Sequence, residues 1–347
     1  MQGTQCYTFD PMGNRLTKTD SANGNDTYTY NNANMLLSRN GGSYTNDLNG
    51  NTLTGGGRSN TWDGQNRLTQ VVYNGTTTTH TYGADGLRRR TVQGANTTDY
   101  LLDDQSVVRT KLNGNVDKTY LHGARGPEYE RNGSNAPVWY LYDGLGSVLG
   151  TVDGSGNVAS TRKYDVYGAV RASTGGSGPK HKFVGQLGHP SEDETGLIYM
   201  RARYYDPVTG RFVSQDPARH GSNWYVYADN APTLKVDPSG QVPITEILAA
   251  YQELELRLAH ILASGGAPLA GRAVVVSMFE VEGFMAGVIG KLHAFDDVSM
   301  ALKWLGQQRP VYEALQRIRG VVQNAQVAEK TKEQAEEACA TLLSLFL

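Results

Sequence analysis

The stretch YTFDPMGNRL at residues 7–16 decides how this sequence is interpreted. Two later stretches keep its order, YTNDLNGNTL at residues 44–53 and NTWDGQNRL at residues 60–68. Weaker copies lie at residues 28–36, 82–88, 142–148 and 164–170. In each copy an aromatic-rich segment ends at Asp or Asn or shortly before a Gly, a turn follows, and an apolar or basic residue comes next. A fixed order around each turn indicates a repeated structural unit.

The repeat has the chemistry of a β-hairpin. Aromatic residues two positions apart point to the same face of a strand. Asp and Asn side chains bond the backbone two residues further on, and Gly adopts the left-handed conformation that tight turns need. One hairpin cannot bury its apolar face alone, so we expect stacked copies to form a long sheet. An ordinary β-sandwich with coincidental turns is the alternative.

The composition changes near Gly240. Of the 20 tyrosines, 18 precede this residue, as do all asparagines except Asn324, whereas Ala, Leu, Val, Glu and Gln dominate afterwards. Tyr and Thr suit strands and Asn and Gly suit turns, while Ala, Leu, Glu and Gln favour helix. We therefore predict a mainly β fold, an array of hairpins up to about residue 240, followed by a small all-α C-terminal region.

The overall composition excludes several classes of protein. The net charge is −2 and the pI is about 6.4, which argues against a nucleic-acid-binding protein. The two cysteines, Cys6 and Cys339, lie at opposite ends of the chain, so neither a disulfide framework nor a cysteine-based zinc site is expected. We expect no cofactor and no metal. The N-terminal residues lack the basic and apolar segments of a signal peptide.

The repeats resemble the YD repeats of Rhs and related polymorphic toxin proteins. Three later stretches strengthen the resemblance: YDGLGSV at 142–148, ETGLIYMRARYYDPVTGRFVSQDP at 194–217 and NWYVYADNAPTLKVDPSG at 223–240. The last two are similar to the Rhs repeat-associated core. The resemblance implies a YD-repeat array at residues 1–190 that forms part of a spiralling sheet or shell. It also implies a core with a self-cleavage motif at 191–241 and a helical effector region at 242–347.

The resemblance also implies an intramolecular aspartic-type autoprotease. In the family two aspartates of D-P motifs cut the chain, and here these are Asp216 and Asp237. Arg211 is expected to bias the pair through its positive charge. The cut would fall between Gln241 and Val242, although Gln241 stands where the family has Leu. Taken without the resemblance, the D-P motifs favour plain turns over catalytic residues.

Function and partners follow from the same resemblance. The chain would be a fragment of a toxin-encapsulating protein that releases its own C-terminal region as cargo, for interbacterial competition or secretion. Expected partners are a cognate immunity protein and a secretion-system spike, such as that of type VI secretion, with export to the outside or the cell surface by a specialised route. The alternative is a non-enzymatic YD-repeat surface or interaction protein without self-cleavage.

The C-terminal region has apolar residues at helical spacing but no evident catalytic set. His260, His293 and Cys339 are isolated from other chemically active residues. The sequence GFMAG at residues 283–287 contains the spacing of a close-packing motif of membrane helices, but charged residues interrupt the surrounding apolar stretch. A membrane-active tail and an inert helical tail both remain open.

Overall fold

The computed structural model describes residues 4–22, 24–123, 126–134, 136–176, 178–219 and 221–241. The chain divides into two compact units, Met1–Pro243 and Ile244–Leu347, and all described residues belong to the first. The predicted helical region at 242–347 therefore lies outside the described residues.

The described residues form three antiparallel sheets in which neighbours in sequence are neighbours in space. The first sheet has five strands: β1 (Gln5–Phe9), β2 (Arg15–Asp20), β3 (Asp26–Tyr30), β4 (Leu36–Arg39) and β5 (Gly42–Ser43). The second has fourteen strands: β6 (Thr45–Asn46), β7 (Thr52–Gly55), β8 (Arg58–Trp62), β9 (Leu68–Tyr73), β10 (Thr76–Tyr82), β11 (Arg88–Gln93), β12 (Asn96–Asp103), β13 (Ser106–Leu112), β14 (Asn115–Gly123), β15 (Gly126–Asn132), β16 (Pro137–Tyr142), β17 (Val148–Asp153), β18 (Val158–Tyr164) and β19 (Val170–Thr174). The third has four short strands and is accompanied by two short 3-10 helices: β20 (Ser191–Glu192), β21 (Leu197–Met200), β22 (Arg203–Asp206), β23 (Arg211–Phe212), η1 (Gly185–Leu187) and η2 (Ala228–Asn230).

The repeat forms the hairpin that its sequence predicts. At the β8–β9 turn, Asp63 Oδ1 accepts the N–H groups of Gln65 at 2.9 Å and Arg67 at 3.0 Å. The register between the strands shifts at the aromatic residue just before this aspartate, Trp62, and the apolar residue after the turn, Leu68, is 1% exposed. Asp10, Asp47, Asp143 and Asp165 accept the same pair of N–H groups in their own turns.

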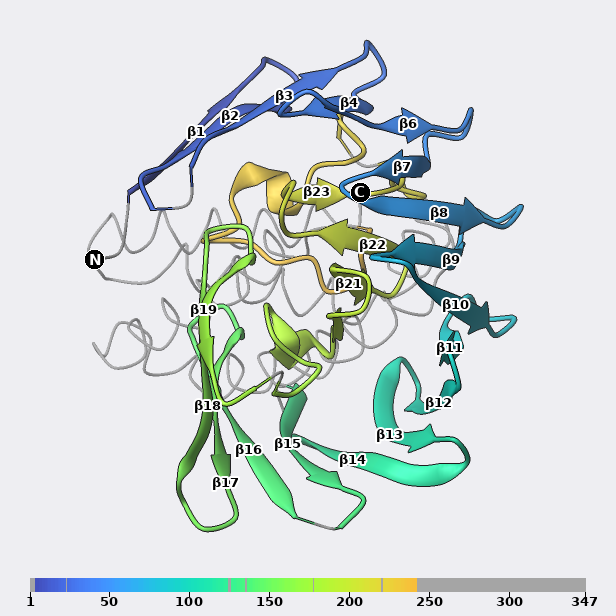
Figure 1. Ribbon diagram of the computed structural model, residues 1–347, viewed down its shortest axis with the longest axis vertical. Coiled ribbons are helices and arrows are strands. Elements are labelled where there is room, and N and C mark those ends of the chain that lie inside the picture. The colour runs from blue at the N-terminus through green and yellow to red at the C-terminus, as the bar shows by residue number, and fades with distance from the viewer. Residues whose placement is uncertain are drawn as a thin grey trace, which may run out of the picture. The chain divides into compact units, whose positions relative to one another are not determined.

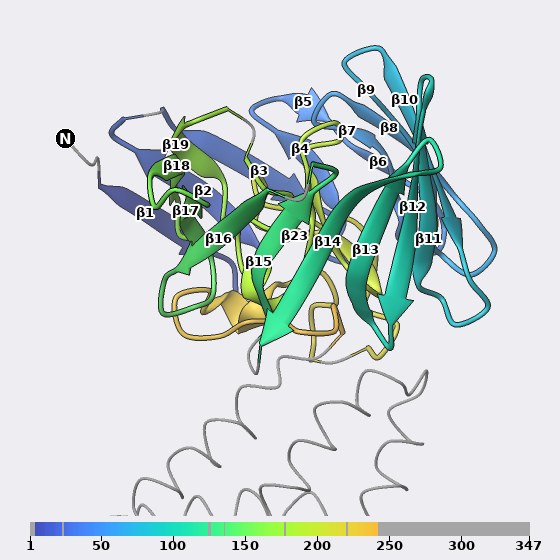
Figure 2. The same cartoon turned by 90° about the horizontal axis from the view of Figure 1, so that it is seen from below.

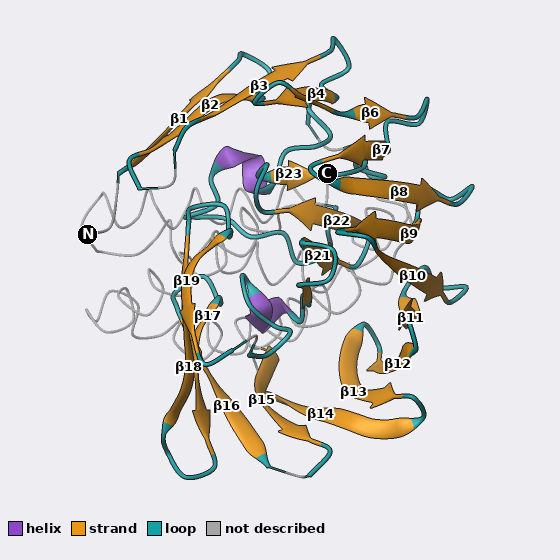
Figure 3. Ribbon diagram, in the orientation of Figure 1, coloured by secondary structure: helices purple, strands orange, loops and turns teal. Residues whose placement is uncertain are grey.

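The first two sheets, here called the wall, curve around the segment from residue 178 to 241, here called the core segment (Figure 1). Coloured by secondary structure, the wall is almost entirely strand, whereas loops make up much of the core segment (Figure 3). The view turned by 90° places β23 behind the wall strands β14 and β15 (Figure 2). The concave side of the wall is thus filled by a later part of the same chain, and the prediction of a mainly β repeat array is confirmed.

Apolar packing and buried ion pairs join the wall to the core segment. Leu68 and Val71 of β9 pack in one buried cluster with residues of the core segment, Leu197, Tyr199, Tyr204 and Val213. Arg58 of β8 forms an ion pair with Asp206, and Arg88 of β11 forms one with Glu192. In both pairs each side chain is 6% exposed or less, so the wall and the core segment share one interior.

The two ends of the wall approach each other without strand pairing between them. Lys18 lies 2.8 Å from Asp165, and Arg171 lies 3.0 Å from Asp20. The rings of Tyr7 and Tyr167 meet edge to face, with centroids 5.3 Å apart. Side-chain contacts therefore connect β1 and β2 to β19 and to the turn that precedes it, and the sheet is not closed into a barrel.

Candidate functional site

Asp216 follows β23 in a turn that fixes its carboxylate. Its backbone N–H donates to the carbonyl of Trp224 at 2.9 Å, and its Oδ1 accepts the N–H of Ala218 at 3.0 Å. The residue is 4% exposed. The hydrogen bond to Trp224 ties the segment after β23 to a stretch of the core segment that comes later in the chain.

Asp237 lies in a tight loop with the residues that follow it. Its Oδ1 accepts the N–H groups of Ser239 at 3.2 Å, Gly240 at 2.8 Å and Gln241 at 3.2 Å. The residue is 1% exposed. Three donors on one carboxylate oxygen hold the backbone from 237 to 241 in one compact conformation, which we call the D-P loop.

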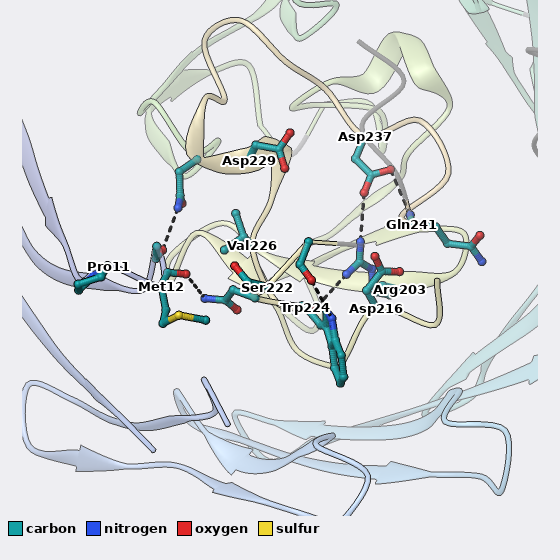
Figure 4. Close-up of a pocket in the computed structure, with 14 residues that line it drawn as sticks. Pro11, Met12, Arg203, Asp216, Ser222, Trp224, Val226, Asp229, Asp237 and Gln241 are labelled. Carbon is teal, nitrogen blue, oxygen red and sulfur yellow. Dashed lines mark hydrogen bonds and ion pairs between the residues drawn. The ribbon is translucent and has the colours of Figure 1, made fainter. Parts of the chain in front are cut away.

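Arg203, the first residue of β22, connects the two aspartate segments. Its Nη2 lies 3.2 Å from Asp237 Oδ2, its Nη1 donates to the carbonyl of Trp224 at 3.0 Å, and its Nε donates to the carbonyl of Gly240. Figure 4 shows its guanidinium group pointing to Asp237. Burial lowers the pKa of Arg203, while the negative charges of Asp216 and Asp237 oppose that shift.

Both aspartates therefore act on the same cation, and they also act on each other. Burial raises the pKa of Asp237, and the charge of Asp216 adds to this, whereas Arg203 and the N–H groups of Gly240 and Ser239 counter it. A buried carboxyl group beside a second carboxylate tends to keep its proton. A carboxyl group with a raised pKa, such as that of Asp237, is the kind of group that can serve as a general acid.

The three side chains open onto a cavity of about 270 Å³. Gln241, Trp224 and Asp229 also line it, together with Met12 from the β1–β2 turn of the wall. The Asp237 end of this cavity is where the D-P loop leaves the described part of the chain (Figure 4). There is room beside the carboxylates for water and for a short stretch of polypeptide.

The structure separates Arg211 from the two aspartates that the sequence analysis assigned it to. Arg211 in β23 lies over the rings of Tyr30 at 4.8 Å and Tyr225 at 4.7 Å, and it donates to the carbonyl of Asn34. The cation beside the aspartates is Arg203, which the sequence analysis did not single out. The available signal was an arginine directly before two tyrosines, Tyr204 and Tyr205, both of which are buried.

The predicted cleavage position is described on one side only. The Gln241 N–H is bound by Asp237, whereas Val242 lies outside the described residues. Within the described ranges no cluster of three or more His, Cys, Asp or Glu side chains could hold a metal ion. In the same ranges no helix is both long and apolar enough to cross a membrane.

A curved wall of hairpins around a segment of its own chain defines a repeat-shell protein. The chain belongs to the Teneurin YD-shell family, whose family model matches residues 2–232. This confirms the resemblance to YD-repeat and Rhs-type proteins.

Several toxins are similar to this chain. The tRNA3(Ser)-specific nuclease WapA of Bacillus spizizenii is 32% identical over 251 residues, which cover 67% of this chain and 11% of that protein. Toxin subunit YenC1 of Yersinia entomophaga is 34% identical over 50% of this chain and 18% of its own length. Toxin protein Tse5 of Pseudomonas aeruginosa is 37% identical over 33% of this chain and 9% of its own length. The chain thus spans a small part of the length of these relatives.

Among solved structures, the complex TcdB2-TccC3 without its hypervariable C-terminal region is similar, with a TM-score of 0.45 and 19% identity. The match covers 69% of this chain and 17% of the chain in the solved structure.

Proposed function

We propose that this chain is part of a toxin-type YD shell that cuts its own backbone between Gln241 and Val242. The observation that supports this proposal is the placement of both aspartates near Arg203 in one cavity. Asp216 and Asp237, which are distant in sequence, both act on this buried guanidinium group, and all three side chains line one cavity beside the D-P loop. A buried acid with a shifted pKa in a cavity, as Asp237 is, is typical of catalytic sites.

The chemistry would be the hydrolysis of one peptide bond. Asp216, as the carboxylate, takes a proton from water while the water oxygen attacks the carbonyl carbon of Gln241. Asp237, as the protonated acid, donates to that carbonyl oxygen. Asp216 then passes its proton to the nitrogen of Val242 as the carbon–nitrogen bond breaks, and the former carbonyl oxygen returns its proton to Asp237. A new carboxyl group and a new amine result, and both aspartates regain their starting states. The bond belongs to the same chain, and its effective concentration at the site is therefore very high.

Intact mass of the purified chain tests this proposal. Wild-type protein should contain a fragment that begins at Val242, and Asp216→Asn and Asp237→Asn should abolish it. Asp229→Asn is the matched control, because Asp229 lines the same cavity but is an exposed partner of Lys235. Full-length protein alone in the wild type, or a fragment that persists in both aspartate variants, would refute the proposed reaction.

A scaffold without self-cleavage is the second candidate, and one observation favours it. Asp206, Asp216 and Asp237 each precede a proline, and each accepts the backbone N–H two residues further on. This is the hydrogen bond of an ordinary turn. The scaffold function predicts an uncleaved wild-type chain with unchanged folding in Asp216→Asn.

We also propose residues 242–347 as the cargo that cleavage would release, as an effector in interbacterial competition or secretion. The relatives include proteins named as tRNA nucleases, a double-stranded DNA deaminase toxin and a toxin subunit. Such different activities point to the shell as the shared part. Export by a specialised route such as type VI secretion, with a spike and an immunity protein as partners, belongs to the same proposal. Release of residues 242–347 into the medium of a culture tests it.

A further inference from the structure

The turn between β21 and β22 binds consecutive carbonyl groups of the D-P loop. Arg201 Nη1 donates to the carbonyl of Pro238. The next N–H, that of Ala202, donates to the carbonyl of Ser239 at 3.2 Å. Arg203 Nε donates to the carbonyl of Gly240. Three successive residues of the turn thus hold three successive peptide groups immediately before Gln241.

The opposite side of the loop is held as well. Asp237 Oδ1 accepts the N–H groups of residues 239, 240 and 241. Gly240 approaches the turn so closely that an added Cβ would lie 2.0 Å from the Met200 carbonyl oxygen. The backbone polar groups that precede Gln241 are therefore engaged on both sides, which leaves the loop little freedom to move.

Arg201 is the member of this turn that has no role in the proposed chemistry. Its Nη2 donates to the carbonyl of Leu187 at 2.9 Å, and its Nη1 lies 3.0 Å from His189 Nε2. No carboxylate of the described residues forms an ion pair with it. A partly buried guanidinium group with carbonyl partners uses its planar fork to fix geometry, because the fork donates in two directions at once.

We propose that Arg201 is a positioning residue for self-cleavage, which fixes the D-P loop by joining the Pro238 carbonyl to the Leu187 carbonyl. This inference rests on the proposed function. The inference goes beyond the proposed function, because Arg201 touches no reacting atom. Arg201 acts on the position of the carbonyl group that follows the loop contacts, that of Gln241. A small displacement of a reacting group lowers a rate strongly, since the bound geometry supplies much of the rate enhancement.

The first test measures the loop without cleavage. In the full chain carrying Asp216→Asn, hydrogen exchange of the peptide that contains residues 237–241 is followed by mass spectrometry. Arg201→Gln should raise exchange in this peptide by about tenfold. Arg109→Gln, an exposed arginine of the wall strand β13, is the matched control and should leave it unchanged. Equal exchange in the two folded variants would overturn the role of Arg201 in holding the loop.

The second test measures cleavage in chains that carry both catalytic aspartates. After dilution from denaturant, Arg201→Gln should slow the appearance of the fragment by about tenfold or more. Arg201→Ala should regain part of the rate in roughly 50 mM guanidinium, far below the molar concentrations that unfold proteins. A normal rate in Arg201→Gln, with raised exchange, would overturn the positioning role. A wild-type chain that never cleaves would refute the proposed function and the positioning role together, and the exchange test would still decide whether Arg201 holds the loop.

Discussion

At the scale of single residues, His181 couples the stability of the fold to pH. Its ring is buried against the rings of Tyr120 and Tyr140, with centroids 4.9 and 6.1 Å away. Burial, with smaller contributions from His122, Lys118 and Arg201, lowers the pKa of His181 from 6.5 to about 3. Between about pH 3 and pH 6.5, His181 is therefore neutral in the folded state and protonated in the unfolded state.

The sign of the pH dependence follows from this difference. Below pH 6.5 the unfolded chain binds the proton and the folded chain does not, so stability falls as the pH falls toward 3. Between pH 6.5 and pH 5 we expect a loss of about 2 kcal/mol from this residue, at about 1.4 kcal/mol per pH unit. Urea unfolding of wild type and His181→Gln checks this. The free energy of unfolding of His181→Gln should fall less steeply with decreasing pH than that of the wild type. The difference between the two proteins at pH 8 gives the effect of the substitution on packing alone. The same slope against pH in both proteins would contradict the prediction.

Gly240 has no room for a side chain, and a comparison with Gly156 separates this effect from that of its positive φ. Gly240 and Gly156 both have positive φ, +74° and +85°, so alanine at either position costs about 1 kcal/mol through the backbone. Only at Gly240 would the new Cβ meet another atom, the Met200 carbonyl oxygen. Gly240→Ala should therefore lower the melting temperature more than Gly156→Ala does and should loosen the D-P loop in hydrogen exchange. Equal effects of the two substitutions would show that the close approach does not matter.

Which arginine faces the aspartates could not be predicted from the sequence. Asp216 and Asp237 stood out because each precedes a proline in a recognisable motif. Arg211 and Arg203 both lie in strands of the same small sheet, β23 and β22. The direction of a side chain depends on strand pairing, and here Arg203 pairs with Met200 while Arg211 pairs with Asp206. That register is a tertiary property which no local pattern contains.

At the scale of elements, the aspartate or asparagine that starts most of the repeat turns acts as a turn cap. Asp63 holds two N–H groups, and Asn31 holds the corresponding pair in its own turn, those of Ala33 at 3.0 Å and Met35 at 2.9 Å. Asp63→Ala should therefore cost about 1 kcal/mol, the usual effect of losing a cap, whereas Asp63→Asn should cost much less. Urea unfolding at neutral pH checks the pair. Equal losses for Ala and Asn would contradict the cap and point to the charge of Asp63 instead.

The hairpins were the most predictable part of the fold, because each is specified within about ten residues by its aromatic residues, aspartate and turn. The curvature of the wall was suggested only by resemblance. It depends on contacts such as Arg58 with Asp206, whose partners are too far apart in sequence for any repeat pattern to reveal. The boundary near Gly240 followed from composition, and the helices expected beyond it lie outside the described residues.

At the scale of the whole unit, buried ion pairs make the stability of the wall depend on the core segment. In the pair Arg88–Glu192 the side chains are 2% and 4% exposed, and Arg88 also lies over the rings of Tyr100 and Tyr199. Removing one partner of such a pair leaves an uncompensated charge, at a cost of about 3–5 kcal/mol.

A double-mutant cycle tests this dependence. Arg88→Met and Glu192→Gln should each destabilise strongly, and the double variant should lose clearly less than their sum, measured by the free energy of unfolding. Arg89→Met is the matched control, because the neighbouring pair Arg89–Asp85 is 40% and 44% exposed and should contribute about 1 kcal/mol or less. Additive losses at Arg88 and Glu192 would contradict the coupling.

The hydrogen bonds from residues 201–203 to the D-P loop have a consequence for when cleavage could occur during synthesis and folding of the chain. The strands that carry this hold are themselves anchored to β8 and β11, which are synthesised long before residue 241. The ribosome therefore completes the anchoring strands well before the loop. If the peptide bond after Gln241 breaks only when the loop is held in this way, cleavage would depend on correct folding of the wall. Chains with a misfolded wall would then keep residues 242–347 attached. Release of these residues would occur only from correctly folded chains.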